Sequence, residues 1–182
     1  KVISYVKKVV RKNKKENANE VPLAFTLTTS DWPDFIRAAE RIKSALGEVG
    51  IEIRINAIPF SLLEERIIKP RDFEILLFGQ VYGYEPDPFP FWHSSQIKDH
   101  GLNIALFTDK KADILLEEAR RTSDPLERDR NYHEFQKIVL EEIPAVFLYS
   151  QLYLYLLPND LAGASFTKIS LPSDRFATIN EW

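Results

Sequence analysis

Residues 23–57, LAFTLTTSDWPDFIRAAERIKSALGEVGIEIRINA, decide the fold class of this chain. Bulky apolar residues alternate with threonine over residues 23–29, as they do in a half-buried strand. Pro33 then falls in the first turn of a helix, where its missing N–H costs no hydrogen bond. Residues 51–57 alternate apolar with polar side chains, which predicts a second strand with one solvated face. The stretch therefore predicts a strand–helix–strand unit.

The ends of the intervening helix carry their own signals. We expect Ser30 or Asp31 to cap its start and Gly50 to close it. Beyond the second strand, residues 60–68 predict a short helix, and residues 73–78, FEILLF, predict a third and almost fully buried strand. This order of elements predicts an α/β fold with a mixed, partly parallel sheet flanked by helices.

Two further helices are predicted in the second half of the chain. The first is capped by Thr108 or Asp109 and runs to about Arg121. The second starts after Asp124, with Glu127 in the position of a capping box. The residues of the first helix that are expected to face inward are Ile114, Leu115 and Ala119, and those of the second are Tyr132, Phe135, Ile138, Val139 and Leu140.

The chain beyond the second helix changes character. Pro144 is expected to stop that helix, because it cannot continue the backbone hydrogen bonding. Residues 146–149 and 152–157 are rich in aromatic and branched side chains. They predict two strands or a hairpin.

The amino-acid composition excludes several classes of function. The chain has 182 residues, a net charge of −3, 45% hydrophobic residues and no cysteine. These are values of a folded globular domain, and they exclude disulfides and cysteine-ligated metals. Residues 1–20 are expected to form a basic helix and linker, and residues 21–182 a single lobe. We expect no nucleic-acid role, since the chain has no repeated basic–aromatic pattern. Because the chain has no initiator Met, we expect it to be a fragment.

Residues 80–96, QVYGYEPDPFPFWHSSQ, are the most unusual stretch of the chain. They combine three prolines with two tyrosines, two phenylalanines, a tryptophan and a histidine. Three prolines oppose both a helix and a central strand, because each removes a backbone donor and fixes one dihedral angle. The rings must therefore either fill the core of the domain or line a surface that meets a ligand or partner.

The sequence offers no constellation for catalysis, and we expect neither a metal nor a cofactor. His93 and His100 flank Asp99, but three scattered histidines are too few to argue a metal site. Ser94 lacks the glycine-flanked turn of a hydrolase nucleophile. Adjacent carboxylate pairs lie on predicted helices, where neighbouring side chains point about 100° apart and cannot share a substrate. Asp87 is different, because a ligand or the backbone of its own loop could engage it.

Four blocks of sequence follow one another in a recognisable order. Residues 27–53 give a strand, a helix and the start of a strand, GIEI. The aromatic loop reads EPDPFPFWHSSQ over residues 85–96, with Asn103 beyond it. Residues 112–128, ADILLEEARRTSDPLER, give a helix pair, and residues 142–149, EIPAVFLY, a strand. Together these blocks resemble the C-terminal lobe of the bacterial extracellular solute-binding proteins of family 5, the peptide and nickel type.

The resemblance implies one lobe of a periplasmic-binding-protein-like fold of type II. Members of the family are not enzymes, and they enclose their ligand between two lobes and deliver it to an ABC importer. The implied partners are therefore an oligopeptide or sugar, the N-terminal lobe of the same protein and the transporter permease. The implied location is periplasmic or extracellular, with the intact protein anchored as a lipoprotein.

The resemblance also places the ligand beside the segment after the third strand. The strongest candidates for ligand contact are Gln80, Tyr82 and Tyr84. Peptide-binding members commonly carry Trp at the first of these positions and, a few residues later, an Asp that anchors the peptide amino group. The present chain has neither, so its side chains suit stacking and neutral hydrogen bonding instead. The further candidates for ligand contact are Asp87, Trp92, His93 and Asn103.

Two other functions are compatible with the residues. The aromatic loop could meet a partner protein rather than a small molecule. Alternatively, Glu85, Asp87 and His93 could contribute to an enzyme whose other catalytic residues lie outside this chain.

Overall fold

The computed structural model describes residues 23–83, 85–98, 101–150 and 154–158, residue 169, residues 171–176 and residue 179. The basic helix expected in residues 1–20 lies outside the described residues. The chain forms two compact units that meet in sequence between Gly79 and Gln80. The single lobe over residues 21–182 therefore stays a prediction, and each unit is described by itself.

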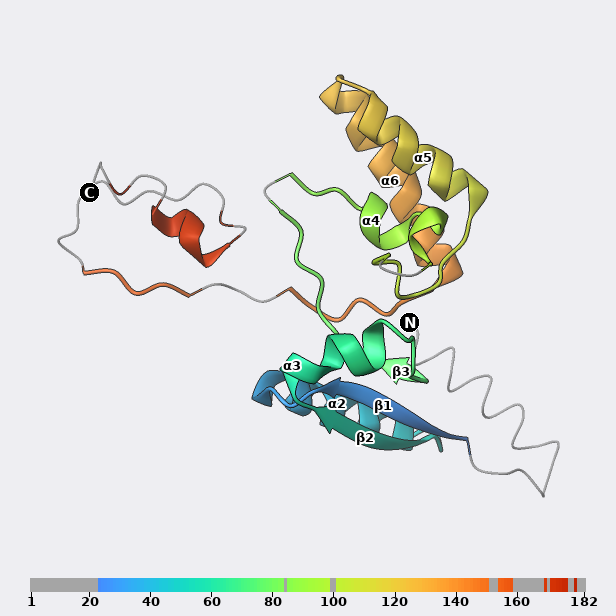
Figure 1. Cartoon of the computed structure of the whole chain (residues 1–182), viewed down its shortest axis with the longest axis vertical. Coiled ribbons are helices and arrows are strands. Elements are labelled where there is room, and N and C mark those ends of the chain that lie inside the picture. Colours follow the sequence, from blue (N-terminus) through green and yellow to red (C-terminus); the bar gives the residue numbers. More distant parts are fainter. Residues whose placement is uncertain are drawn as a thin grey trace. The chain divides into compact units, whose positions relative to one another are not determined.

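The first unit is built on a parallel sheet of three strands in the order β2-β1-β3 (Figure 1). The central strand β1 (Ala24–Ser30) pairs along its whole length with β2 (Glu52–Ile58). On its other side β1 pairs with β3 (Ile75–Leu76). The predicted strand–helix–strand order and the α/β class are thus confirmed, and the sheet among the described residues is wholly parallel.

One face of this sheet is covered by helix α2 (Pro33–Gly47). Leu27 and Ile53 from the strands are buried together with Ala39 from the helix, and partly buried isoleucine, leucine and phenylalanine side chains surround them. The helix begins one residue later than predicted, with Trp32 as its N-cap and no side-chain cap. Gly50 closes the turn with a φ of 85°, a left-handed conformation that glycine adopts without strain.

The connection from β2 to β3 is helical, as predicted. It consists of α3 (Phe60–Leu63) and a π-helical turn, Glu64–Ile68, and buries Leu63 and Ile67. The third strand is much shorter than the predicted 73–78. The Leu77 N–H still donates to the Thr28 carbonyl at 2.9 Å, but the Leu77 carbonyl accepts from the Thr29 hydroxyl. The prediction of an almost fully buried strand was also wrong, because Ile75 and Leu76 are only partly buried and Phe78 is exposed.

The second unit contains the helix pair α5 (Lys110–Arg121) and α6 (Pro125–Glu142), which lie side by side (Figure 1). Asp109 and Asp124 cap the two helices, as the sequence predicts. The aromatic loop contains one helical turn, α4 (Phe89–Trp92), followed by a 3₁₀ turn, Ser94–Gln96, and a further 3₁₀ turn covers Pro172–Phe176. The prediction that the prolines exclude a helix here was wrong, because Pro90 falls in the first turn. The core of this unit consists of Trp92, Phe107, Ala112, Leu116, Phe135 and Val139.

Four local predictions for this unit were wrong. Ile114 is 54% exposed, and the inward face of α5 is shifted to Ala112, Leu116 and Ala119. Leu140 of α6, expected to face inward, is exposed as well. The Glu127 carboxylate accepts a hydrogen bond from the Thr122 hydroxyl instead of closing a capping box. No strand forms in residues 146–150 or 154–158. A strand requires a hydrogen-bonded neighbour, and these described residues pair with none.

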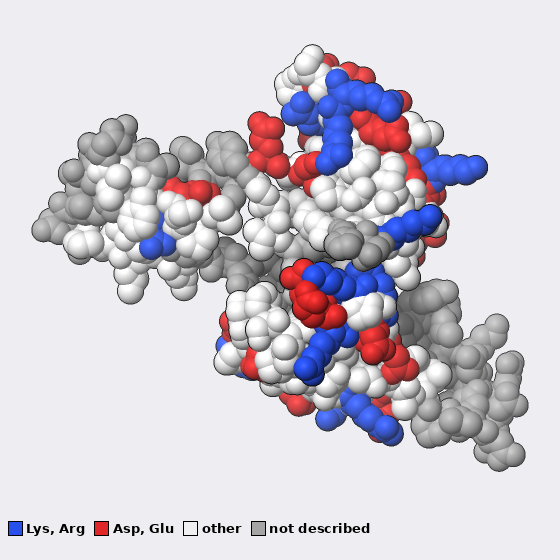
Figure 2. Space-filling view, in the orientation of Figure 1, with Lys and Arg blue, Asp and Glu red and all other residues white. Residues whose placement is uncertain are grey.

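Charge is distributed evenly over the visible surface. Figure 2 shows basic and acidic side chains mixed over both units on the face in view, in keeping with the small net charge of −3. None of the helices in the described part of the chain combines the length and the apolar composition that crossing a membrane requires.

Candidate functional site

The carboxyl ends of the strands form the first candidate region. All pairs in the sheet are parallel, so β1, β2 and β3 end at the same edge. The chain leaves β1 toward β2 and returns to β3 on the opposite side of β1. In open α/β sheets, ligands bind outside the carboxyl ends of strands at such a reversal of strand order.

An aromatic pair stands at this edge. Trp32 follows β1 and Phe60 follows β2, and their rings stack with centroids 4.7 Å apart and planes inclined by 21°. The Asp31 N–H donates to the Ile58 carbonyl at 3.0 Å, which ties the two strand ends together and sets the spacing of the rings. Trp32 is nonetheless 52% exposed and Phe60 47% exposed. Two large apolar rings held in place but left open to solvent are suited to stacking against a ligand.

The sequence reasoning missed this pair. It assigned Phe60 to the apolar face of a short helix and gave Trp32 no role. The signal was present, since each aromatic residue stands two positions beyond the last residue of a strand. Recognising it requires knowing that the two strands are parallel neighbours.

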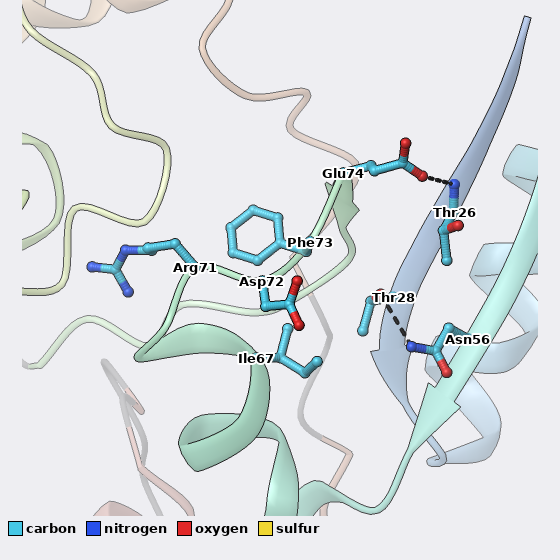
Figure 3. Close-up of a pocket in the computed structure, with 8 residues that line it drawn as sticks. All are labelled: Thr26, Thr28, Asn56, Ile67, Arg71, Asp72, Phe73 and Glu74. Carbon is cyan, nitrogen blue, oxygen red and sulfur yellow. Dashed lines mark hydrogen bonds between the residues drawn. The ribbon is translucent and has the colours of Figure 1, made fainter.

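The first unit also contains a cavity of about 390 Å³. Figure 3 shows Thr26, Thr28 and Asn56 from the strands on one side, with Ile67 and the loop before β3 opposite. The other lining residues are Arg71, Asp72, Phe73 and Glu74. The Glu74 carboxylate accepts from the Thr26 N–H at 2.6 Å. The cavity lies over the polar face of the sheet and at the start of β3, away from the carboxyl edge, so it lacks the position expected of the ligand site.

Gln80 and Tyr82 belong to a hydrogen-bonded chain in the second unit. The Trp92 indole Nε1–H donates to the Tyr82 hydroxyl at 3.1 Å, and that hydroxyl donates to Gln80 Oε1 at 3.3 Å. The Tyr82 ring also meets the Phe91 ring edge-on, with centroids 5.1 Å apart. Gln80 itself is exposed and Tyr82 half-buried. The chain of hydrogen bonds therefore runs from the core to an exposed amide. Tyr84 lies outside the described residues.

Burial of Tyr82 has a consequence for stability at alkaline pH. Burial raises the pKa of the Tyr82 phenol, the Trp92 hydrogen bond opposes this, and the Asp87 charge adds to it. The unfolded chain ionises this phenol near its ordinary pKa of about 10, so stability falls as the pH rises from there through the higher folded pKa. We expect Tyr82→Phe to make urea unfolding measured between pH 9 and 11 less pH-dependent. A variant whose stability falls as steeply as that of the wild type would contradict this.

Asp87 is engaged within the loop and by α5. Its Oδ1 accepts from the Phe89 N–H at 3.1 Å, the loop's own Asx-type hydrogen bond. Arg120 Nε donates to Oδ1 and Oδ2 of Asp87 at 3.2 and 3.0 Å. The same guanidinium lies 3.9 Å from the centroid of the Phe89 ring. Asp87 thus fastens the aromatic loop to α5, which leaves less of its carboxylate for a ligand.

His93 is buried rather than a solvated loop residue. Its ring stacks on that of Phe89 with centroids 4.1 Å apart. Its Nδ1 accepts from the Ser95 N–H at 3.1 Å, so the neutral ring carries its hydrogen on Nε2. Nε2 lies 3.4 Å from Glu117 Oε1 and 3.8 Å from Asp113 Oδ1. Nε2 is buried close to these two carboxylates of α5 but forms no hydrogen bond with either of them.

Asn103 is the central hydrogen-bonding residue of this unit. Its side chain has 0% exposure. The Nδ2 group lies within hydrogen-bond distance of three backbone carbonyls, those of Trp92, His93 and Phe107, at 3.2, 3.2 and 2.9 Å. Its Oδ1 accepts from the Phe107 N–H at 3.1 Å. Like buried Trp92, Asn103 has its polar groups engaged within the protein, and this geometry gives both residues the role of holding the loop in place.

No metal site was found among the residues described. No three His, Asp or Glu side chains there gather closely enough to hold an ion. His100 and Asp99, part of the weak metal pattern in the sequence, lie outside them.

No family model matches the chain. Individual known proteins are nevertheless similar to it in sequence and in structure. The chain is 29% identical over 126 residues to the oligopeptide-binding protein AppA of Bacillus subtilis, an alignment covering 69% of this chain and 23% of AppA. It is 26% identical over 155 residues to the probable D,D-dipeptide-binding periplasmic protein DdpA of Escherichia coli, covering 84% of this chain and 30% of DdpA. The solved structure of Bacillus subtilis AppA in complex with a nonapeptide matches 76% of this chain and 30% of its own, with a TM-score of 0.67 and 26% identity. The chain matches part of a family 5 solute-binding protein.

The fold of the chain is that of the type II periplasmic binding proteins. The structure of NikZ from Campylobacter jejuni in complex with Ni(L-His) shares it, with a TM-score of 0.65 and 24% identity over 78% of this chain. The chain spans about a quarter of the length of AppA and under a third of that of DdpA. The resemblance inferred from the four sequence blocks is thus confirmed.

Proposed function

We propose that this chain is part of the substrate-binding component of an ABC importer and that the intact protein captures an oligopeptide between two lobes. The observation that carries the proposal is the agreement of sequence and fold with AppA, whose structure holds a nonapeptide. Several other similar proteins are named for binding dipeptides or tripeptides. A role as a protein-interaction domain or as part of an enzyme has no comparable support.

The geometry is consistent with binding rather than catalysis. The stacked rings of Trp32 and Phe60 stand open at the carboxyl edge of the sheet. Gln80 is exposed and follows shortly after the end of β3. We propose Trp32 and Phe60 as ligand-contacting residues of the first unit. Independently, we propose Gln80, Tyr82 and Tyr84 as ligand-contacting residues of the second. We propose no catalytic role for the chain.

The remaining parts of the proposal concern the intact protein. Its partners are the N-terminal lobe and the permease, and its location is periplasmic or extracellular with a lipid anchor. DdpA, named as a periplasmic protein, supports the location. A sugar is the alternative ligand, since neutral tyrosine and glutamine side chains also suit hydroxyl groups.

Titration calorimetry of the intact protein tests the function. We expect dipeptides to pentapeptides to bind with dissociation constants of about 1 μM or lower and maltose not to bind. The fragment of residues 21–182 should bind the same peptides at least about 100-fold more weakly, because closing two lobes supplies much of the binding energy. Equal affinity of fragment and intact protein would refute capture between two lobes, and binding of maltose alone would refute the peptide.

A further inference from the structure

The hydrogen-bonded chain from Trp92 to Gln80 has a fixed direction. An indole Nε1–H can only donate, so the Tyr82 oxygen accepts it at 3.1 Å. The single hydrogen of the Tyr82 hydroxyl is then left for another acceptor. That acceptor is Gln80 Oε1, at 3.3 Å. In the structure the Tyr82 hydroxyl therefore links the Trp92 donor to the oxygen end of the Gln80 amide.

The two atoms of the Gln80 amide consequently differ in availability. Oε1 is engaged by Tyr82, while the side chain as a whole is exposed. The Nε2 group carries two hydrogens and makes no hydrogen bond with the residues that the structure describes. It therefore presents two donors to the surroundings.

The Trp92 end of the hydrogen-bonded chain is rigid. Trp92 is 4% exposed, and its ring packs edge-on against Phe107 and Phe135. Its carbonyl is held by Asn103 Nδ2 at 3.2 Å. A buried, packed indole has one orientation, so its N–H keeps the Tyr82 oxygen in place beside Gln80.

We propose that Gln80 is a specificity-determining residue that donates a hydrogen bond from Nε2 to an acceptor oxygen of the ligand, and that Tyr82 positions it. On the proposed peptide-binding function, that oxygen is a peptide carbonyl or the C-terminal carboxylate. This inference rests on the proposed function but concerns only one contact within it.

Gln80→Glu in the intact protein tests the direction of the contact. The substitution keeps the shape, removes both donors and places a carboxylate near the ligand oxygen, so trialanine should bind about 10-fold or more weakly at pH 7. The ratio to wild type should shrink at pH 4, because a protonated carboxyl regains an O–H donor near its ordinary pKa of about 4.3. Gln136→Glu, the same change at an exposed position of α6, is the matched control and should leave affinity unchanged.

Two ligand forms identify the oxygen. If trialanine and its C-terminal amide lose equal affinity in Gln80→Glu, the acceptor is a backbone carbonyl; if only trialanine does, it is the terminal carboxylate. Both results support the proposal. Tighter or unchanged binding of trialanine to Gln80→Glu would overturn it. Failure of wild type to bind either form would instead overturn the peptide-binding function on which it rests.

The positioning role of Tyr82 has a readout without ligand. The Trp92 indole N–H, assigned with Trp92→Phe, should exchange slowly with solvent in the intact protein and faster in Tyr82→Phe, which removes its acceptor. Tyr82→Phe should also weaken trialanine binding by about 3-fold, a modest effect because Gln80 remains but is no longer oriented. Tyr132→Phe, which removes a partly buried phenol from α6, is the control. Unchanged indole exchange in Tyr82→Phe would refute the hydrogen-bonded chain.

Discussion

Replacing Asn103 with Asp is expected to lower the free energy of unfolding by about 4 kcal/mol, the largest effect on stability that we predict. The change keeps the oxygen that accepts from the Phe107 N–H but turns the donating Nδ2 into a second oxygen. Three buried carbonyls then lose their donor, and a carboxylate faces them in a site with 0% exposure. No cation is among the hydrogen-bonding partners of Asn103 that could offset this charge.

Urea unfolding followed by tryptophan fluorescence provides the measurement. Asn56→Asp is the matched control, because Asn56 is exposed on β2 and its amide makes only a long contact of 3.5 Å with the Thr28 hydroxyl. We expect that control to change stability by less than about 0.5 kcal/mol. If Asn103→Asp were equally mild, the three carbonyls would not depend on this side chain.

The second large effect concerns the affinity for peptides. Trp32→Ala and Phe60→Ala are each expected to weaken binding of peptides with apolar side chains to the intact protein by about 10- to 30-fold. The two rings stack on one another at 4.7 Å, so each substitution removes one ring and also releases the other. Their combined loss should therefore be smaller than the product of the single losses.

Stability distinguishes this effect from a general loss of structure. Both rings are about half exposed, so each single variant should unfold within about 1 kcal/mol of wild type. Leu140→Ala, at an exposed position on α6, should change neither affinity nor stability. Peptide affinity that is unchanged in both aromatic variants would remove the carboxyl edge of the sheet from the binding surface.

The sequence predicted the elements of the fold where local signals sufficed. Alternation of apolar and polar residues located β1 and β2, and the capping residues Asp109 and Asp124 located α5 and α6. No strand forms in the described residues 146–150 and 154–158. Branched and aromatic side chains indicate only a preference for strand, whereas a strand depends on a neighbour elsewhere in the chain. The prediction that Ile114 faces inward was wrong for a related reason, because the spacing of apolar residues along α5 is compatible with either of two inward faces.

The candidate site was predictable only in part. The aromatic loop was identified by its composition, but composition could not separate Gln80, which is exposed, from Asn103, which is buried. The difference arises from contacts between residues more than ten positions apart, such as that of Asn103 with the carbonyl of Trp92. Trp32 and Phe60 were missed because their stacking follows from parallel pairing of two strands rather than from a motif.

The strand order β2-β1-β3 bears on how the chain acquires its structure during synthesis. Thr28 in the central strand pairs with Asn56 on one side and with Leu76 on the other. The ribosome therefore releases β1 well before either neighbour exists, and one edge stays open until β3 has emerged. Long-range pairing of this kind makes folding slow compared with helical domains and leaves a nascent strand edge open to other chains. The interval between emergence of β1 and of β3 is thus the period when protection by a chaperone would matter most.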